Sequence, residues 1–184
     1  MKKIVALFIG LTIIGLGCES TNFSEEIKTI DSLLVELDTI DLMQRRVDTT
    51  GFSQSSQTFT ENITYVQRTF TDRKDTMSKD IAVLMSDYRS LKKPSKGFLG
   101  KYQRTREEIT FAKNQLADLR HDLQNNLLDS NLVDKMLEDE IKAVDEVKNS
   151  VENLQISSDF TRSKREELEP RIDSLIQVLK QDEP

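Results

Sequence analysis

The residues that could perform chemistry in this chain are few and scattered. A single histidine, His121, is the one side chain whose ordinary pKa suits a general base near neutral pH. A general base needs a nucleophile or an orienting partner at a defined geometry, and the sequence places neither beside it. We therefore expect His121 to be an exposed helix residue, and we predict that the protein is not an enzyme.

A second candidate site is the acidic run Glu138-Asp139-Glu140, which could bind a divalent cation through its carboxylates. On a helix Glu138 lies near Lys142, and Lys135 is close by, so these two cations would offset part of the negative charge. We expect a solvated acidic face here, and we predict neither a metal ion nor a cofactor.

Gly97-Phe98-Leu99-Gly100-Lys101 places glycines and a lysine together, as a phosphate-binding loop does. That loop needs four residues between its glycines and a Ser or Thr after the lysine. Here two residues separate the glycines and Tyr102 follows the lysine, so we predict a turn without a phosphate.

Aromatic residues recur at helical spacing along the chain, and such a stripe is typical of a core. They are Phe59, Phe70, Tyr88, Tyr102 and Phe111. In a splayed bundle, Phe70 together with Met77 and Met85 could instead line a groove for an apolar ligand.

The N-terminal residues have the three-part pattern of a secretory signal peptide. Lys2 and Lys3 precede an apolar run over residues 4–14, and Gly15-Leu16-Gly17 then lead to Cys18, the only cysteine. This run is shorter than the roughly 20 residues that a membrane-spanning helix needs. We predict that residues 1–17 are removed and that the chain is exported.

A lone cysteine directly after a small residue at the end of such a leader resembles the lipid-acceptor cysteine of bacterial lipoproteins. In that family a Leu and two small residues usually precede the Cys; here Gly17 fits, and Leu16 lies one place nearer to Cys18. The resemblance implies lipidation of Cys18 and attachment to a membrane of the cell envelope. Two or more acyl chains anchor a protein stably in a membrane, because each buried CH₂ contributes about 0.8 kcal/mol of binding free energy. An ordinary cleaved leader is the alternative.

Charge and composition narrow the possible partners. Loss of the leader would leave 24 Lys and Arg residues against 32 Asp and Glu, a net charge of −8, so we expect no nucleic-acid partner. With Cys18 acylated there would be no disulfide and no thiolate metal site, so packing alone must stabilise the fold. Few glycines and prolines, with 32% charged residues, are typical of a protein of long helices.

The spacing of apolar residues predicts where those helices lie. Apolar residues recur at intervals of three and four over residues 24–47, over 59–91 with a stutter at Met77, and over 102–123. Loops are expected over 48–56 and 93–100 because of their Gly, Ser, Thr and Pro content. Turn-forming residues at 125–131 favour a break, although the heptad phase runs through them.

The C-terminal third should contain another helix boundary. Ser157-Ser158-Asp159 could cap a last helix, and Pro170 predicts a kink or a restart after Glu169. The chain is then divided into a signal peptide (1–17), a lipidated cysteine with a polar tether (18–23), a helical bundle (24–181) and a polar tail (182–184). We expect an all-α fold: an elongated antiparallel bundle of four or five helices with coiled-coil-like heptads.

These observations favour a membrane-anchored lipoprotein of the cell envelope whose helical bundle is a structural or protein-interaction module. Its partners would be the membrane, through Cys18, and another envelope protein or a second copy of the chain. The alternative is a periplasmic carrier or chaperone-like bundle that binds apolar ligands. We rank a small-molecule ligand below a protein partner.

Overall fold

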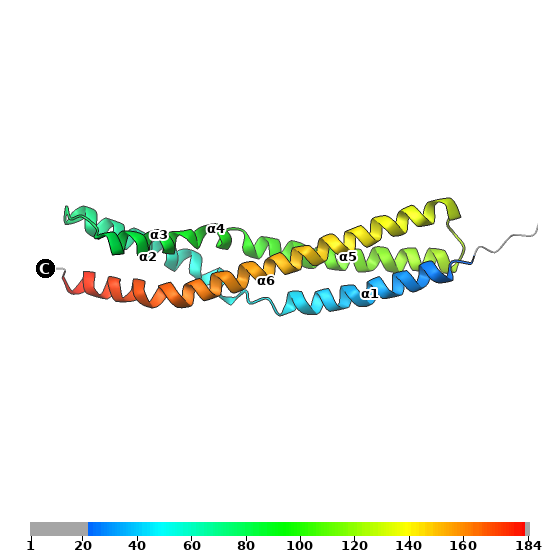
Figure 1. Cartoon of the computed structure of the whole chain (residues 1–184), viewed down its shortest axis with the longest axis horizontal. Coiled ribbons are helices and arrows are strands. Elements are labelled where there is room, and N and C mark those ends of the chain that lie inside the picture. Colours follow the sequence, from blue (N-terminus) through cyan, green and yellow to red (C-terminus); the bar gives the residue numbers. More distant parts are fainter. Residues whose placement is uncertain (1–21, 183–184) are drawn as a thin grey trace, which may run out of the picture.

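The computed structural model describes residues 22–182, apart from the side chains of residues 51 and 53–56. This part of the chain is helical throughout, with short connections and no strand, and it forms an elongated bundle (Figure 1). The predicted all-α bundle is therefore confirmed. The helices are α1 (Ser24–Arg45), α2 (Thr50–Asp72), α3 (Lys79–Ser90), the four-residue α4 (Lys92–Ser95), α5 (Phe98–Gln124) and α6 (Ser130–Gln181).

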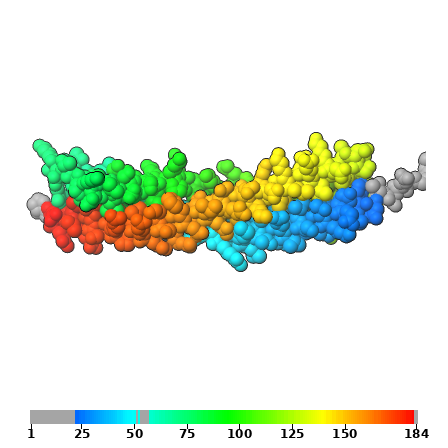
Figure 2. Space-filling view, viewed as in Figure 1, coloured from blue at the N-terminus to red at the C-terminus, as the bar shows by residue number. Residues whose placement is uncertain are grey.

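The 52-residue helix α6 is shared by two three-helix units that lie end to end. Its first half packs beside α1 and α5, and its second half packs beside α2 and the α3–α4 segment. In the space-filling view the two halves of α6 continue one another while their neighbours change (Figure 2). Each unit therefore has its own core, and α6 contributes to both.

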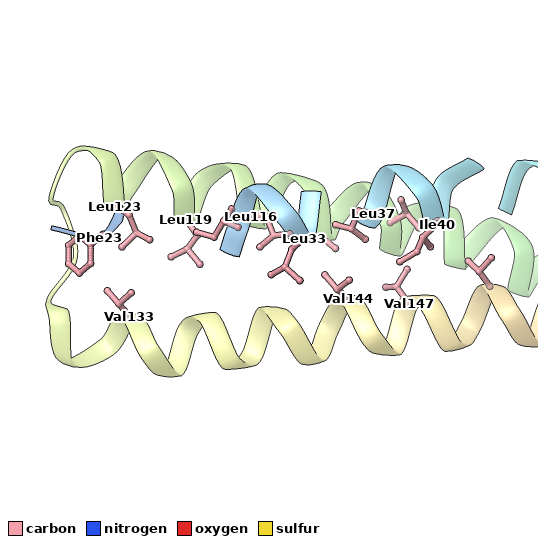
Figure 3. Packing of buried hydrophobic residues seen from close by; sticks show 14 residues of the cluster. Phe23, Leu33, Leu37, Ile40, Leu116, Leu119, Leu123, Val133, Val144 and Val147 are labelled. Atoms are coloured by element: carbon pink, nitrogen blue, oxygen red, sulfur yellow. The ribbon is translucent and has the colours of Figure 1, made fainter. Parts of the chain in front are cut away.

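The core of the first unit forms where the apolar stripes of α1, α5 and α6 meet (Figure 3). Fully burying one Leu or Ile side chain contributes about 1.5–3 kcal/mol, so this stripe holds the three helices together. Ion pairs flank it: Lys113 lies 2.7 Å from Asp38, and Arg120 lies 2.9 Å from Asp31. The buried residues are Phe23, Ile30, Leu33, Leu37, Ile40, Ile109, Ala112, Leu116, Leu119, Leu123, Val133, Val144, Val147 and Val151.

The core of the second unit is built from α2, α3 and the second half of α6. The Phe59 and Tyr88 rings pack against each other at its centre, with centroids 4.4 Å apart. The buried residues are Phe59, Val66, Leu84, Met85, Tyr88, Leu91, Leu168, Ile172 and Leu179. Most of these positions belong to the predicted stripes, which explains why the fold class follows from the periodicity.

The two units meet at a small junction core made of Val47, Phe52, Phe98 and Leu154. Buried polar side chains reinforce it. The Gln44 amide donates to the Tyr102 carbonyl at 2.8 Å.

The structure corrects the prediction of one long helix over 59–91. The chain turns between Asp72 and Lys79, so that α2 and α3 form a hairpin (Figure 1). Lys74 adopts a left-handed conformation with φ of 53°, and the Ser78 hydroxyl accepts from the Ile81 N–H to cap α3. Six consecutive polar residues, 71–76, precede Met77. The heptad phase passes over them, but a helix there would have no apolar surface to bury.

The structure also corrects the predicted boundary at residues 157–159, because α6 passes through them without interruption. Ser158 is buried, and its hydroxyl donates to the Asp48 carbonyl at 2.9 Å. A small polar side chain therefore satisfies a backbone carbonyl where the α1–α2 connection crosses α6. Pro170 also lies inside α6, and the helix neither stops nor restarts there.

The three predicted loops have different outcomes. A break between α5 and α6 is confirmed, with Asn126 in a left-handed conformation and Asp129 capping α6. The loop over 93–100 is shorter than predicted, because residues 93–95 belong to α4 and α5 begins at Phe98; the turn is confined to residues 96 and 97, with Gly97 at φ of 75°. The predicted loop over 48–56 is longer than the observed connection, because α2 already begins at Thr50.

Among the described helices, none combines the length and apolar character needed to cross a membrane.

Candidate interaction surface

Cys18, the predicted lipid acceptor, lies outside the described residues, as does the whole predicted signal peptide. The described chain begins with Asn22, and α1 follows almost at once. The anchor therefore stays a prediction from the sequence.

His121 lies near the C-terminal end of α5 with its side chain 68% exposed. Its Nδ1 atom is 3.3 Å from the Asp122 carboxylate, which is the next residue along the same helix. The prediction of an exposed helix residue is confirmed.

The acidic run Glu138-Asp139-Glu140 lies on α6. Within residues 22–182, no group of three or more His, Cys, Asp or Glu side chains is arranged to hold a metal ion. Partial burial raises the pKa of Glu140, and the negative charge of Asp139 raises it further. The raised pKa means that protonation of Glu140 requires less free energy than protonation of an ordinary glutamate. The Glu140 side chain lines a groove described below.

The aromatic stripe divides into core and surface residues. Phe59 and Tyr88 are buried as predicted, and Met85 is buried with them rather than lining an open groove. Phe111 is an exception, because its side chain is 64% exposed. The prediction that Phe111 belongs to the core is wrong for a geometric reason: Ala112, the next residue, occupies the core position on that turn of α5.

Phe111 borders a groove between α5 and α6, which we call the α5–α6 groove. It has a volume of about 590 Å³. Ala112 and Val147 are buried, and both line it together with Ala143 and Phe111. Its polar lining includes Arg104 at one end and the carboxylates Glu108, Glu140 and Glu146. The groove therefore combines apolar surface with an acidic border.

The charges on α5 are unequally distributed along its length. Residues 88–106, the last nine of which begin α5, contain seven Lys and Arg residues and no acid, and Lys101, Arg104 and Arg106 lie on the helix itself. None of the seven is in an ion pair with another described residue, although most other parts of the bundle contain such pairs. The opposite end carries Asp118 and Asp122 on the same side of the helix as Arg104 and Phe111, while Arg120 is paired with Asp31 of α1.

This distribution opposes the dipole of α5. The N-terminal end of a helix carries a partial positive charge, and the C-terminal end carries a partial negative one. Lys101 lies in the first turn of α5, and Asp122 lies in the last. The positive charge of Lys101 is therefore at the partially positive end of the helix, and the negative charge of Asp122 is at the partially negative end. Each such placement costs about 0.3–1 kcal/mol at an exposed site.

The phase of the apolar residues could have identified this surface from the sequence. The core positions of α5 are Ile109, Ala112, Leu116, Leu119 and Leu123, and Phe111 lies outside that series. The groove itself depends on the pairing of α5 with α6, which the spacing does not specify. Comparisons with protein-family models, with curated proteins and with solved structures find no match to this chain.

Proposed function

We propose that this protein is a membrane-anchored lipoprotein of the cell envelope, and that its helical bundle acts by contact rather than by catalysis. The observation that carries the proposal is the exposure of Phe111 beside the α5–α6 groove. An aromatic side chain is a large apolar surface, and contact with a partner would remove it from water.

The position of the first helix supports the anchoring part of the proposal. α1 begins at one end of the elongated bundle, beside the turn that joins α5 and α6 (Figure 1). Only residues 19–23 separate Cys18 from Ser24. Five residues span at most about 17 Å, so a lipid on Cys18 would hold this end of the bundle near the membrane.

Fractionation of cells that carry the wild-type chain or Cys18→Ser tests the anchor. We expect the wild-type protein in the membrane fraction, resistant to high salt and released by detergent. We expect Cys18→Ser in the soluble fraction of the envelope, because it has lost the acyl chains. Identical membrane retention of both forms would contradict the proposed anchor.

Affinity capture after cross-linking in the native membrane tests the contact function. We expect a reproducible cross-linked product with the wild-type chain, and a weaker one with Phe111→Asp. The matched control is Val178→Asp, which changes an exposed apolar residue at the other end of α6. Recovery of monomer alone would contradict a contact function.

A second groove favours the carrier as the alternative. It has a volume of about 410 Å³, with Phe59 and Leu91 in its lining and Lys92 and Lys96 also present. An apolar chain with an anionic head group fits this combination. Mass spectrometry of the protein extracted from its membrane would detect such a lipid. Protein free of bound lipid would contradict the carrier.

A further inference from the structure

We propose that α5 is the contact helix of an antiparallel homodimer, in which Phe111 of each copy enters the α5–α6 groove of the other. This inference rests on the proposed contact function and names the partner as a second copy of this chain. It does not depend on the lipid anchor.

The first argument is the match between a side chain and a groove on the same surface. Phe111 is 64% exposed, and the groove beside it has room for more than one phenyl ring at about 590 Å³. A two-fold axis close to Phe111 would place each Phe111 over the other copy's groove. One contact would then be made twice, as a two-fold interface requires.

The second argument is the charge register along α5. Arg104 and Asp118 are each seven residues from Phe111, one before it and one after it. Seven residues are close to two helical turns, so both side chains share the Phe111 face at about 10.5 Å on either side. Both residues are exposed, and neither is in an ion pair with another described residue.

This register selects the antiparallel orientation. With the two-fold axis at Phe111, Arg104 lies level with Asp118 of the partner subunit, and the pair occurs twice. A parallel dimer would place Arg104 level with Arg104 of the partner subunit, and Asp118 level with Asp118 of the partner subunit. Opposite charges across an interface set its orientation, and facing like charges are repulsive.

The intervening positions of α5 are compatible with this register. Glu107 lies level with Gln115 of the partner subunit, and Glu108 lies level with Asn114 of the partner subunit. An amide can donate to a carboxylate in each case. Within the contact region, therefore, no carboxylate of one α5 lies level with a carboxylate of the other α5.

The third argument is the unfavourable placement of charge on α5. Lys101 in the first turn and Asp122 in the last turn both oppose the helix dipole. An antiparallel second α5 brings Asp118 of the partner subunit level with Arg104 and Asp122 of the partner subunit level with Gly100, next to Lys101. Dimerisation would thus offset an electrostatic cost that the single copy bears.

The contact between residues 104 and 118 spans about 21 Å of helix. It is therefore a small interface, and confinement of both copies to one membrane would strengthen it by raising their effective concentration. The test accordingly uses two formats: sedimentation of the full-length chain in density-matched detergent over a range of concentrations, and lysine cross-linking in membrane vesicles.

Four variants test the register: Phe111→Asp, Arg104→Asp, Asp118→Arg, and the double variant that exchanges the charges of 104 and 118. We expect each single substitution to lower the association constant by about tenfold or more. The double variant restores the opposite-charge pair, so we expect its association to return to within about threefold of wild type. Arg171→Asp is the control, because Arg171 is exposed on α6 in the other unit.

Circular dichroism of every variant confirms that the helices are retained, which these exposed positions should allow. Wild-type protein that is monomeric in both formats would overturn the proposal. So would a dimer that Phe111→Asp leaves intact, or single charge variants that the double variant does not rescue. A dimer that persists in Cys18→Ser would support this inference even if the anchor proposal failed.

Discussion

The Phe52 and Phe98 rings stack at the junction of the two units, with centroids 3.7 Å apart and planes 9° apart. Phe52 belongs to α2 and Phe98 begins α5, and Val47 and Leu154 are buried beside them. This stack is the centre of the small core that joins the two larger ones.

Truncation of Phe98 should therefore destabilise the whole bundle. We expect Phe98→Ala to lower the free energy of unfolding by about 3–5 kcal/mol, because a large buried ring is replaced by a cavity. Urea unfolding followed by far-ultraviolet circular dichroism measures the change. The control is Phe160→Ala, where a side chain that is 50% exposed predicts a change within about 0.5 kcal/mol. Equal losses at both positions would contradict the burial of Phe98.

The two glycines around the start of α5 should respond in opposite directions to alanine. Gly97 has φ of 75°, a conformation that costs about 1–2 kcal/mol for a residue with a Cβ atom. Gly100 lies inside α5, where alanine is favoured by about 0.5–1 kcal/mol. Apart from the adjacent residues and the nearby helix backbone, no heavy atom lies within 4 Å of a Cβ atom at either site, so the backbone conformation decides the effect. We expect thermal unfolding to show Gly97→Ala destabilised and Gly100→Ala stabilised; shifts in the same direction would contradict this account.

Replacement of Pro170 should stabilise α6. Proline in a helix interior costs about 3 kcal/mol, because it lacks an N–H and crowds the preceding turn. Pro170 is exposed, so its ring contributes little to the core. After allowance for the greater freedom of alanine in the unfolded chain, we expect Pro170→Ala to raise the free energy of unfolding by about 1–2 kcal/mol.

Chemical denaturation measures this gain, and Glu166→Ala on the same face provides a control expected to change stability by less than about 0.5 kcal/mol. A loss of stability in Pro170→Ala would show that the bundle requires the proline at this position.

Asp41 should contribute to the acid dependence of stability. Its carboxylate accepts hydrogen bonds from Arg45 at 2.8 and 3.2 Å, and Lys113 of α5 lies 3.5 Å away. The hydrogen bond from Arg45, followed by the charge of Lys113, lowers the pKa of Asp41 despite its partial burial. Since the folded pKa is the lower one, this stabilisation is complete above the ordinary Asp pKa and is lost as pH falls through the folded value.

We expect Asp41→Asn to lose up to about 1 kcal/mol at neutral pH and to approach the wild type in strong acid. Thermal unfolding across this pH range measures the convergence. Asp72→Asn is the control, because its pair with Arg68 is exposed and long at 3.4 Å. A loss at Asp41 that is equal at all pH values would contradict an ionic origin.

The apolar periodicity predicts most of the fold because it specifies which side of each helix is buried. It places the start of α1 and the run of α5, whereas the break before α6 is predicted from turn-forming residues through which the heptad phase continues. It fails at Met77 and Ser158 for different reasons. At Met77 the phase continues across six polar residues, the last four of which lie in the turn between α2 and α3. At Ser158 a residue typical of helix caps is buried by a crossing segment.

The candidate contact surface was less accessible to sequence analysis than the core. Phe111 has the residue type and the approximate spacing of a core residue, and only its phase relative to Ala112 distinguishes the two. The groove requires α5 to pair with α6, and the charge register becomes meaningful only when Phe111 is known to be exposed.

The continuity of α6 sets the reach of the molecule. Its 52 residues form a strut of about 78 Å, with the α5–α6 turn at one end and the α2–α3 turn near the other. In the proposed dimer the axis passes near Ala143, about 38 residues from the far end of each strut. The two α2–α3 turns would then lie about 115 Å apart, while both chains would begin near the middle. Such a dimer would lie along a membrane surface, and its span would be set by the length of one helix.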